Sequence, residues 1–189
     1  MILSLDPGRS CGYAVFQSTD ATIQIVAIGA FDLKAKDAGE IMSAMRHELE
    51  TLLRNFHITF VHLEQYFFNS KFPNGAELNY YLRGAVLLTL HDHKIPHSQH
   101  VATTWKKFVC GTARPSATQV ARYGLKASKA FVKDALETTF DLTLPSTAPI
   151  GSKHLKLRHD TVDAIAIGIF GMSEEKKPFE LHLDKKYAL

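Results

Sequence analysis

The chain has 189 residues, 46% of them hydrophobic, so it can bury a core of its own, and its length fits one domain better than two. No apolar run reaches the roughly 18 residues of a membrane span and no secretory signal opens the chain, which favours a soluble, intracellular protein over a membrane or secreted one. The formal net charge of +3 is compatible with a polyanionic partner but does not identify one.

The first part of the chain predicts an antiparallel meander followed by a helix. Apolar and β-branched runs predict strands over 1–6, 11–17 and 23–32, separated by turn-forming residues such as Pro7-Gly8. The next segment, 38–56, repeats apolar residues at helical spacing. Its apolar stripe should therefore cover one face of the sheet.

The rest of the chain alternates strands with helices. Residues 58–64 predict a strand parallel to its neighbour, because a helix crossover precedes it. The further elements expected are a helix over about 76–91, a strand near 95–101, and helices around 116–139 and 160–173. The predicted fold is a mixed α/β sheet, an antiparallel meander plus parallel strands, flanked by helices. We expect one domain over 1–175, with a loop at 142–157, and a basic surface tail over 176–189.

Four carboxylates stand at the ends of these predicted elements. Asp6 and Glu64 each close a strand, and the carboxyl ends of neighbouring parallel strands meet at one edge of a sheet. Asp160 and Asp163 lie at positions i and i+3 at the start of a helix and so share a helix face. Carboxylates packed together repel one another unless cations are present, and such oxygen ligands select Mg²⁺ or Mn²⁺ over zinc. The sequence therefore predicts a magnesium site at which two ions could promote phosphodiester hydrolysis.

Each acid also has an ordinary structural interpretation. An aspartate before Pro-Gly, such as Asp6, is typical of a turn, and a glutamate at a strand end is usually solvated. The pair Asp160 and Asp163 could cap its helix, favoured by the helix dipole. What favours a catalytic cluster is the joint order along the chain: a strand acid, a meander, a helix, a second strand acid, and a late helix with paired acids.

The segments that carry these acids resemble the motifs of a nuclease family. The run LSLDPGRSCGYAVF is similar to the first motif of bacterial RuvC-type Holliday junction resolvases, members of the RNase H-like superfamily, and HLEQYFF is similar to the second. LNYYLRGAVLLTL resembles the helix that follows, with its Arg-Gly pair, and HDTVDAIAIGI resembles the closing helix. WKKFVCG and KASKAFV resemble two lysine-bearing segments between them. The resemblance covers residues 2 to about 171 and implies an RNase H-like fold.

The resemblance also implies roles for individual residues. The metal ligands would be Asp6, Glu64, Asp160 and Asp163, which would hold two Mg²⁺ ions for which Mn²⁺ substitutes. Phe67 would be the aromatic residue that inserts at the junction. Lys106 and Lys129 would be the basic residues near the scissile phosphate.

Basic residues are concentrated in one stretch that contains a single acid, Asp134. They are Lys106, Lys107, Arg114, Arg122, Lys126, Lys129 and Lys133. This pattern favours a nucleic-acid partner, and Lys107, Lys126 and Lys133 are predicted DNA contacts together with Lys106 and Phe67. The connection between Gly111 and Lys129 is longer than in typical members of the family. Lys126 or Lys133 could therefore take the place of Lys129.

The predicted function is resolution of four-way (Holliday) DNA junctions by a metal-dependent, structure-selective endonuclease that makes paired symmetric nicks. A homodimer is implied because two symmetric nicks call for two active sites, and the apolar helix over 76–91 is the candidate interface. Two alternatives stay open: an RNase H-like nuclease acting on other branched DNA or on RNA–DNA hybrids, and a catalytically silent nucleic-acid-binding relative. The presence of all four acids disfavours the silent relative.

Several other residues have a plain structural interpretation. Four histidines fall in one short segment: His91, His93, His97 and His100. They could suggest zinc, but without nearby paired cysteines we interpret them as surface residues or phosphate neighbours. Cys11 and Cys110 are too few for a disulfide framework and are interpreted as buried thiols, and Trp105 as a packing residue.

Overall fold

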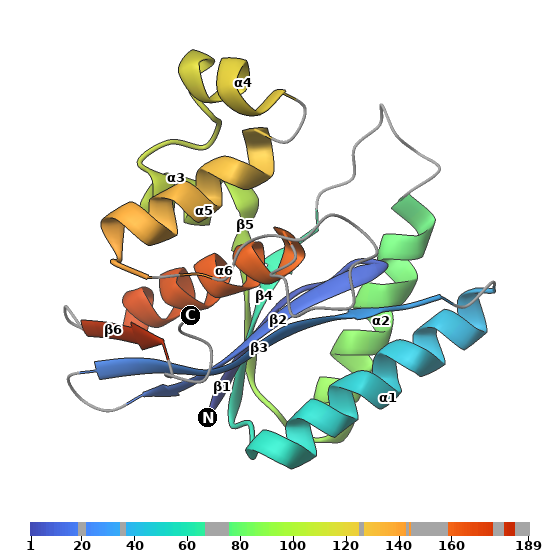
Figure 1. The fold of residues 1–189 in the computed structure, drawn as a ribbon. Coiled ribbons are helices and arrows are strands. Elements are labelled where there is room, and N and C mark those ends of the chain that lie inside the picture. The colour runs from blue at the N-terminus through green and yellow to red at the C-terminus, as the bar shows by residue number, and fades with distance from the viewer. Residues whose placement is uncertain are drawn as a thin grey trace.

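A mixed sheet forms the centre of this computed structural model, with helices on both of its faces (Figure 1). The structure describes residues 1–18, 22–34, 37–66, 76–124, 127–142, 144, 159–175 and 180–183. In that part of the chain the sheet has six strands, in the order β5-β4-β1-β2-β3-β6. The strands are β1 (Ile2–Asp6), β2 (Ser10–Ser18), β3 (Thr22–Asp32), β4 (Phe60–Gln65), β5 (His97–Val101) and β6 (Glu180–Leu183). The helices are α1 (Ala38–Phe56), α2 (Ala76–Asp92), α3 (Ala102–Cys110), α4 (Ala117–Tyr123), α5 (Ala127–Thr139) and α6 (His159–Glu175).

The first three strands form the antiparallel meander that the sequence predicts. β1 pairs with β2 and β2 with β3, both antiparallel, with an irregularity between Val15 and Phe16. β4 pairs parallel with β1, and β5 pairs parallel with β4, because α1 and α2 carry the chain back along the sheet between these strands. The prediction of a mixed α/β sheet flanked by helices is therefore confirmed.

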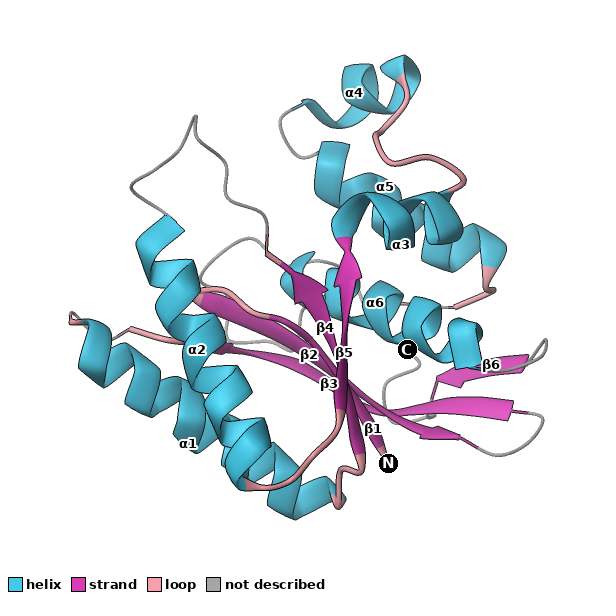
Figure 2. Ribbon diagram, turned by 180° about the vertical axis from the view of Figure 1, so that it is seen from behind, coloured by secondary structure: helices cyan, strands magenta, loops and turns pink. Residues whose placement is uncertain are grey.

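Helices α1 and α2 cover one face of the sheet, and α3, α5 and α6 lie over the other (Figure 2). α1 begins where the Asp37 carboxylate accepts a hydrogen bond of 2.9 Å from the main-chain N–H of Glu40. Its apolar residues, among them Ile41, Met45 and Leu49, are buried against the sheet and α2. The predicted amphipathic role of this segment is confirmed.

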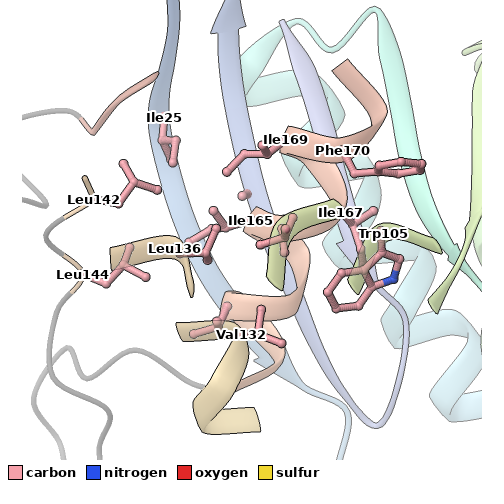
Figure 3. Packing of buried hydrophobic residues seen from close by; sticks show 14 of the residues in the cluster. Ile25, Trp105, Val132, Leu136, Leu142, Leu144, Ile165, Ile167, Ile169 and Phe170 are labelled. Carbon is pink, nitrogen blue, oxygen red and sulfur yellow. The ribbon is translucent and has the colours of Figure 1, made fainter. Parts of the chain in front are cut away.

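Helix α6 is enclosed on all sides, which explains its almost continuous apolar sequence. Every residue from 161 to 172 is buried. Ile165 and Ile169 belong to one core cluster with Trp105 of α3 and Val132 of α5 (Figure 3). The Trp105 side chain has no exposed surface, so its interpretation as a packing residue is confirmed. α6 is thus held between the sheet and a second helical layer.

Three predictions of local structure were wrong. The expected single helix over 116–139 is two helices, because Gly124 ends α4 with φ 55° and ψ −133°, a backbone conformation that favours glycine. Residues 102–110, for which no element was predicted, form α3, whose Trp105 and Val109 are buried one turn apart. Part of the expected surface tail belongs to the sheet, since β6 pairs parallel with β3.

None of the helices in the described ranges is long and apolar enough to cross a bilayer.

Candidate active site

Asp6 and Glu64 line one small cavity at the carboxyl edge of the sheet. The parallel register that aligns Leu5 with Leu63 brings the next residue of each strand to the same edge. The cavity measures about 40 Å³. Its lining consists of Asp6, Pro7, Glu64, Tyr66, Asn79 and Arg83. The structure therefore brings together two of the predicted site residues that lie far apart in the sequence.

The start of α6 brings Asp160 close to Asp6. Gly12 is the cross-strand partner of Asp6, and a Cβ atom on Gly12 would collide with the main chain of Asp160 and Thr161. The pKa of the buried Cys11 thiol is raised, first by burial and then by the negative charges of Asp6 and Asp160, while a backbone hydrogen bond from Gly8 opposes the shift. The pairing of Asp6 with Gly12, and the contact of Gly12 with Asp160, thus place the start of α6 beside the end of β1.

Asp163 lies one helical turn further along α6 and is 2% exposed. It shares the neighbourhood of Cys110 with Lys106. Burial raises the pKa of the Cys110 thiol to about 12, the positive charge of Lys106 opposes the shift, and the charge of Asp163 adds to it. The charges of the predicted lysine of α3 and of the fourth predicted acid thus act in opposite directions on one half-buried thiol.

Two hydrogen bonds fix the start of α6 on the sheet. The Thr161 hydroxyl donates to the Gly29 carbonyl of β3 at 2.8 Å, and the Ser4 hydroxyl of β1 donates to the Ala164 carbonyl at 2.6 Å. Ser4 has no exposed surface, so its bond lies inside the core, where an unmade hydrogen bond would be costly. The position of the α6 acids is therefore set by buried contacts and not by a surface loop.

The predicted ligand set fits a hard divalent cation in its chemistry, although the four acids do not form one closed group. Within the described residues, no three histidine, cysteine, aspartate or glutamate side chains come close enough to count as a preformed metal site. The donors that share the cavity, Asp6 and Glu64, are nevertheless carboxylates, the ligands that Mg²⁺ prefers. The cavity volume of about 40 Å³ leaves room for a few water-sized ligands.

The predicted DNA-binding residues are spread over α3, α5 and segments outside the described part of the chain. Lys106 is half-buried, with its ammonium 4.8 Å from the centre of the Trp105 ring, and Lys107 is exposed. Lys133 is ion-paired with Glu137 at 3.3 Å. Phe67 and Lys126 lie outside the described residues. Lys129 lies in α5, and its side chain is likewise outside what the structure describes.

Sequence reasoning missed three residues of the cavity wall: Tyr66, Asn79 and Arg83. Asn79 and Arg83 are one turn apart in α2 and therefore share a helix face. That spacing is visible in the sequence, but the place of α2 beside β4 depends on packing between distant segments, which the sequence pattern does not give. Tyr66 follows β4 directly, two residues after Glu64.

The interpretation of His100 as a surface or phosphate-neighbouring residue was wrong. His100 is 6% exposed, and its Nε2 atom lies 2.9 Å from Nδ1 of the buried His62. Its other ring nitrogen is 3.3 Å from the Glu174 carboxylate. The alternation of β5 turns His100 toward α6, where the rings of His62 and His100 pack beneath Gly171 and Phe170. Cys11 is buried as expected, whereas Cys110 is partly exposed.

Comparisons with known proteins extend this description. The family model for crossover junction endodeoxyribonuclease RuvC matches residues 2–129. RuvC of Aliarcobacter butzleri is 28% identical over 121 residues, which make up 64% of this chain and 78% of that protein. Thermus thermophilus RuvC, solved in complex with a Holliday junction substrate, superposes with a TM-score of 0.66 at 16% identity, covering 93% of this chain and 94% of the other. The yeast mitochondrial Holliday junction resolvase Ydc2 gives a TM-score of 0.55 at 12% identity, covering 88% and 75%.

An RNase H-like nuclease is the class of protein that this sheet, its two helical layers and its acidic edge define. The structural likenesses establish the fold, and the family match, which spans more than half of the chain, establishes the family. The chain belongs to the RuvC family of crossover junction endodeoxyribonucleases. The prediction of a junction-resolving nuclease is thereby confirmed.

Proposed function

We propose that this enzyme resolves four-way DNA junctions by hydrolysing one phosphodiester bond in each of two symmetrically related strands. The observation that carries the proposal is the acidic edge itself, where Asp6 and Glu64 share one cavity and α6 brings Asp160 beside Asp6. A cavity walled by carboxylates, in a family of metal-dependent nucleases, supports metal-assisted hydrolysis.

The proposed ligands of two Mg²⁺ ions are Asp6, Glu64, Asp160 and Asp163. When bound, the ions would activate a water molecule and stabilise the leaving oxygen. The protein's own contribution is a rigid frame for the ligands. The bonds from Ser4 and Thr161 hold the start of α6 on β1 and β3, so the acids of the helix keep a fixed distance from those of the strands.

Basic residues on the α3 side are proposed to hold the DNA backbone. Lys106 supports this role best, because it shares the surroundings of Cys110 with Asp163 and keeps its ammonium on the Trp105 ring. Lys107, Lys126, Lys129 and Lys133 are proposed to extend the same contact, and Phe67 to insert at the junction. To contact DNA, the Lys133 ammonium would have to leave its ion pair with Glu137 and bind a phosphate group instead.

We propose that the working unit is a homodimer formed through α2. Leu82, Ala85 and Leu90 are buried in this subunit's own core, which removes them from the interface expected from the sequence. Tyr81 and Leu88 are 37% and 54% exposed and lie two turns apart on one helix face. An apolar stripe of this kind, left on the surface of one subunit, is suited to a two-fold symmetric contact.

The acids are tested by Asp6→Asn and Glu64→Gln, which keep the shape of each side chain but remove a charged ligand. We expect no detectable cleavage of a four-way junction in Mg²⁺, while junction binding in Ca²⁺ is largely kept. Asp92→Asn is the matched control, since Asp92 is a 40% exposed acid paired with Arg46 at the end of α2. Loss of binding as severe as the loss of cleavage would count against the proposal.

A further inference from the structure

Arg83 places a half-buried cation in the wall of the cavity that Asp6 and Glu64 line. It projects from α2, one turn after Asn79, and both residues belong to the cavity wall. Its Nη1 atom lies 3.5 Å from the main-chain carbonyl oxygen of Glu64, at the outer limit of a hydrogen bond. The cavity that Asp6 and Glu64 line thus has a cation on its α2 side.

The surroundings of Arg83 favour an anion there. Arg83 is half-buried, and a charge that is partly removed from water is stabilised by an opposite charge beside it. The group carries five N–H donors in a planar fork, and the long contact to Glu64 engages one nitrogen. A guanidinium fork matches the oxygens of a phosphate group, which can accept two parallel hydrogen bonds.

Aromatic side chains adjoin Arg83 at the cavity wall. Tyr66, which also lines the cavity, meets the ring of Tyr80 edge-on with 5.1 Å between ring centres. Tyr80 is 51% exposed and lies three residues before Arg83, on the same side of α2. The cavity wall therefore continues outward as aromatic surface, on which a nucleic-acid strand can lie.

We propose that Arg83 binds a phosphate group of the DNA strand that is cleaved, from the α2 side of the site. The inference rests on the proposed function, because it takes its anion from the junction substrate. Arg83 would then contact the substrate directly, as a substrate-binding residue. If the guanidinium only stabilised the main-chain position of Glu64, the effect of an Arg83 substitution on DNA affinity would not depend on the charge of any single phosphate.

The experiment pairs variants of Arg83 with single neutral linkages in the DNA. The wild-type cut is first mapped in Mg²⁺, and junctions are then made with one methylphosphonate at the mapped linkage or at the linkage on either side. Dissociation constants are measured in Ca²⁺ for wild type, Arg83→Gln and Arg83→Lys. Arg46→Gln is the matched control, because Arg46 is 45% exposed on α1 and pairs with Glu50 at 2.8 Å. Thermal unfolding confirms that each variant is folded.

We expect Arg83→Gln to weaken binding of the unmodified junction about tenfold, the usual effect of losing a charged hydrogen bond. Arg83→Lys should weaken binding less, because lysine keeps the positive charge although it lacks the planar fork of donors. At one of the three modified linkages the difference between wild type and Arg83→Gln should disappear, since the phosphate charge is already absent. If Arg83→Gln is unfolded, the same comparison is made with Arg83→Lys.

An equal penalty at all three neutral linkages, or no penalty on the unmodified junction, would overturn the assignment of Arg83 and leave the proposed function intact. A wild-type protein that neither binds nor cuts the four-way junction would overturn the proposed function, and that result is seen before any variant is made.

Discussion

Gly12 in β2 lies so close to Asp160 at the start of α6 that a Cβ atom on residue 12 would collide with the Asp160 carbonyl group. Asp6 is the cross-strand partner of Gly12, so the contact sets the distance between the first strand acid and the helix that carries the paired acids. Ser4 and Thr161 hold the same end of the helix by hydrogen bonds to the sheet.

Gly12→Ala should slow cleavage sharply while the protein stays folded. The added methyl group meets main-chain atoms of Asp160, which cannot rotate away, so the start of α6 must move. A displacement of about 1 Å at a catalytic group costs on the order of 100-fold in rate, whereas overpacking costs about 1 to 3 kcal/mol of stability. Single-turnover cleavage and chemical unfolding would be measured together.

Gly39→Ala is the control for this substitution. Gly39 lies in the first turn of α1, where an added Cβ would meet the Asp37 carboxylate oxygen at 3.3 Å, the end of a flexible side chain. Both its stability and its cleavage rate should stay near those of wild type, with stability changed by at most about 1 kcal/mol. Equal rates for Gly12→Ala and Gly39→Ala would contradict the role given to the Gly12 contact.

The buried histidine pair should make the fold less stable in acid. Burial, and then the charge of His100, lower the pKa of His62 from 6.5 to about 4. Burial also lowers the pKa of His100, against the opposing effect of Glu174. The unfolded chain therefore takes up protons near pH 6.5 that the folded chain does not. The contribution of the neutral histidine pair to the free energy of unfolding is therefore fully present above pH 6.5 and is lost as the pH falls toward 4.

His62→Phe separates this effect from general acid denaturation. The variant keeps a ring beneath Gly171 but cannot bind a proton. Its unfolding free energy should depend less on pH between 4 and 6.5 than that of wild type, with a difference in slope of at most about 1.4 kcal/mol per pH unit. The same slope in both proteins, measured by denaturant unfolding across that window, would show that His62 does not titrate as described.

The two strand acids could be predicted because each lies at the end of a regular strand. Asp6 is the last residue of β1, Glu64 is the residue before the last of β4, and a helix crossover makes the two strands parallel, so local patterns were enough to place both at one edge. Arg83 could not be found in this way. Its place in the cavity depends on how α2 packs beside β4, and its spacing from Asn79 is shared by many exposed helical pairs.

Two other features have a signal in the sequence. Gly124 interrupts the helical pattern between α4 and α5, and a glycine inside such a pattern is a signal for the end of a helix. The alternation of β5 predicts that His100 faces the interior when His97 and Gln99 face outward. β6 gave no comparable signal, because a short strand that pairs with the distant β3 is decided by tertiary contacts.

Leu88→Glu should separate subunits without unfolding them. Leu88 is 54% exposed, so a charge there costs little in the monomer but would be buried in the proposed dimer. Sedimentation at micromolar concentration should show a dimer for wild type and a monomer for Leu88→Glu. Ser43→Glu, at an exposed position of α1, should remain dimeric. A wild-type monomer, with and without junction DNA, that still makes paired symmetric nicks would refute the dimer.

Metal binding is expected to be measurable apart from catalysis. Mn²⁺ should raise the Tm of the wild-type protein, because a ligand that binds the folded state stabilises it, and Asp6→Asn should reduce the shift. Cleavage should require Mg²⁺ or Mn²⁺, stop in EDTA, and fail with Ca²⁺, whose looser geometry suits binding better than hydrolysis. Full turnover in EDTA would contradict a metal-dependent mechanism.

The choice among branched and unbranched substrates distinguishes a junction resolvase from a general nuclease. The protein would be incubated in Mg²⁺ with four-way, three-way, flap, duplex and RNA–DNA hybrid substrates of matched sequence, and the cut positions would be mapped on every strand. We expect the four-way junction to be cut far faster than the others, by paired nicks at symmetry-related positions of two strands. Equal cutting of flaps, duplex or hybrids, or single unpaired nicks in the junction, would contradict it.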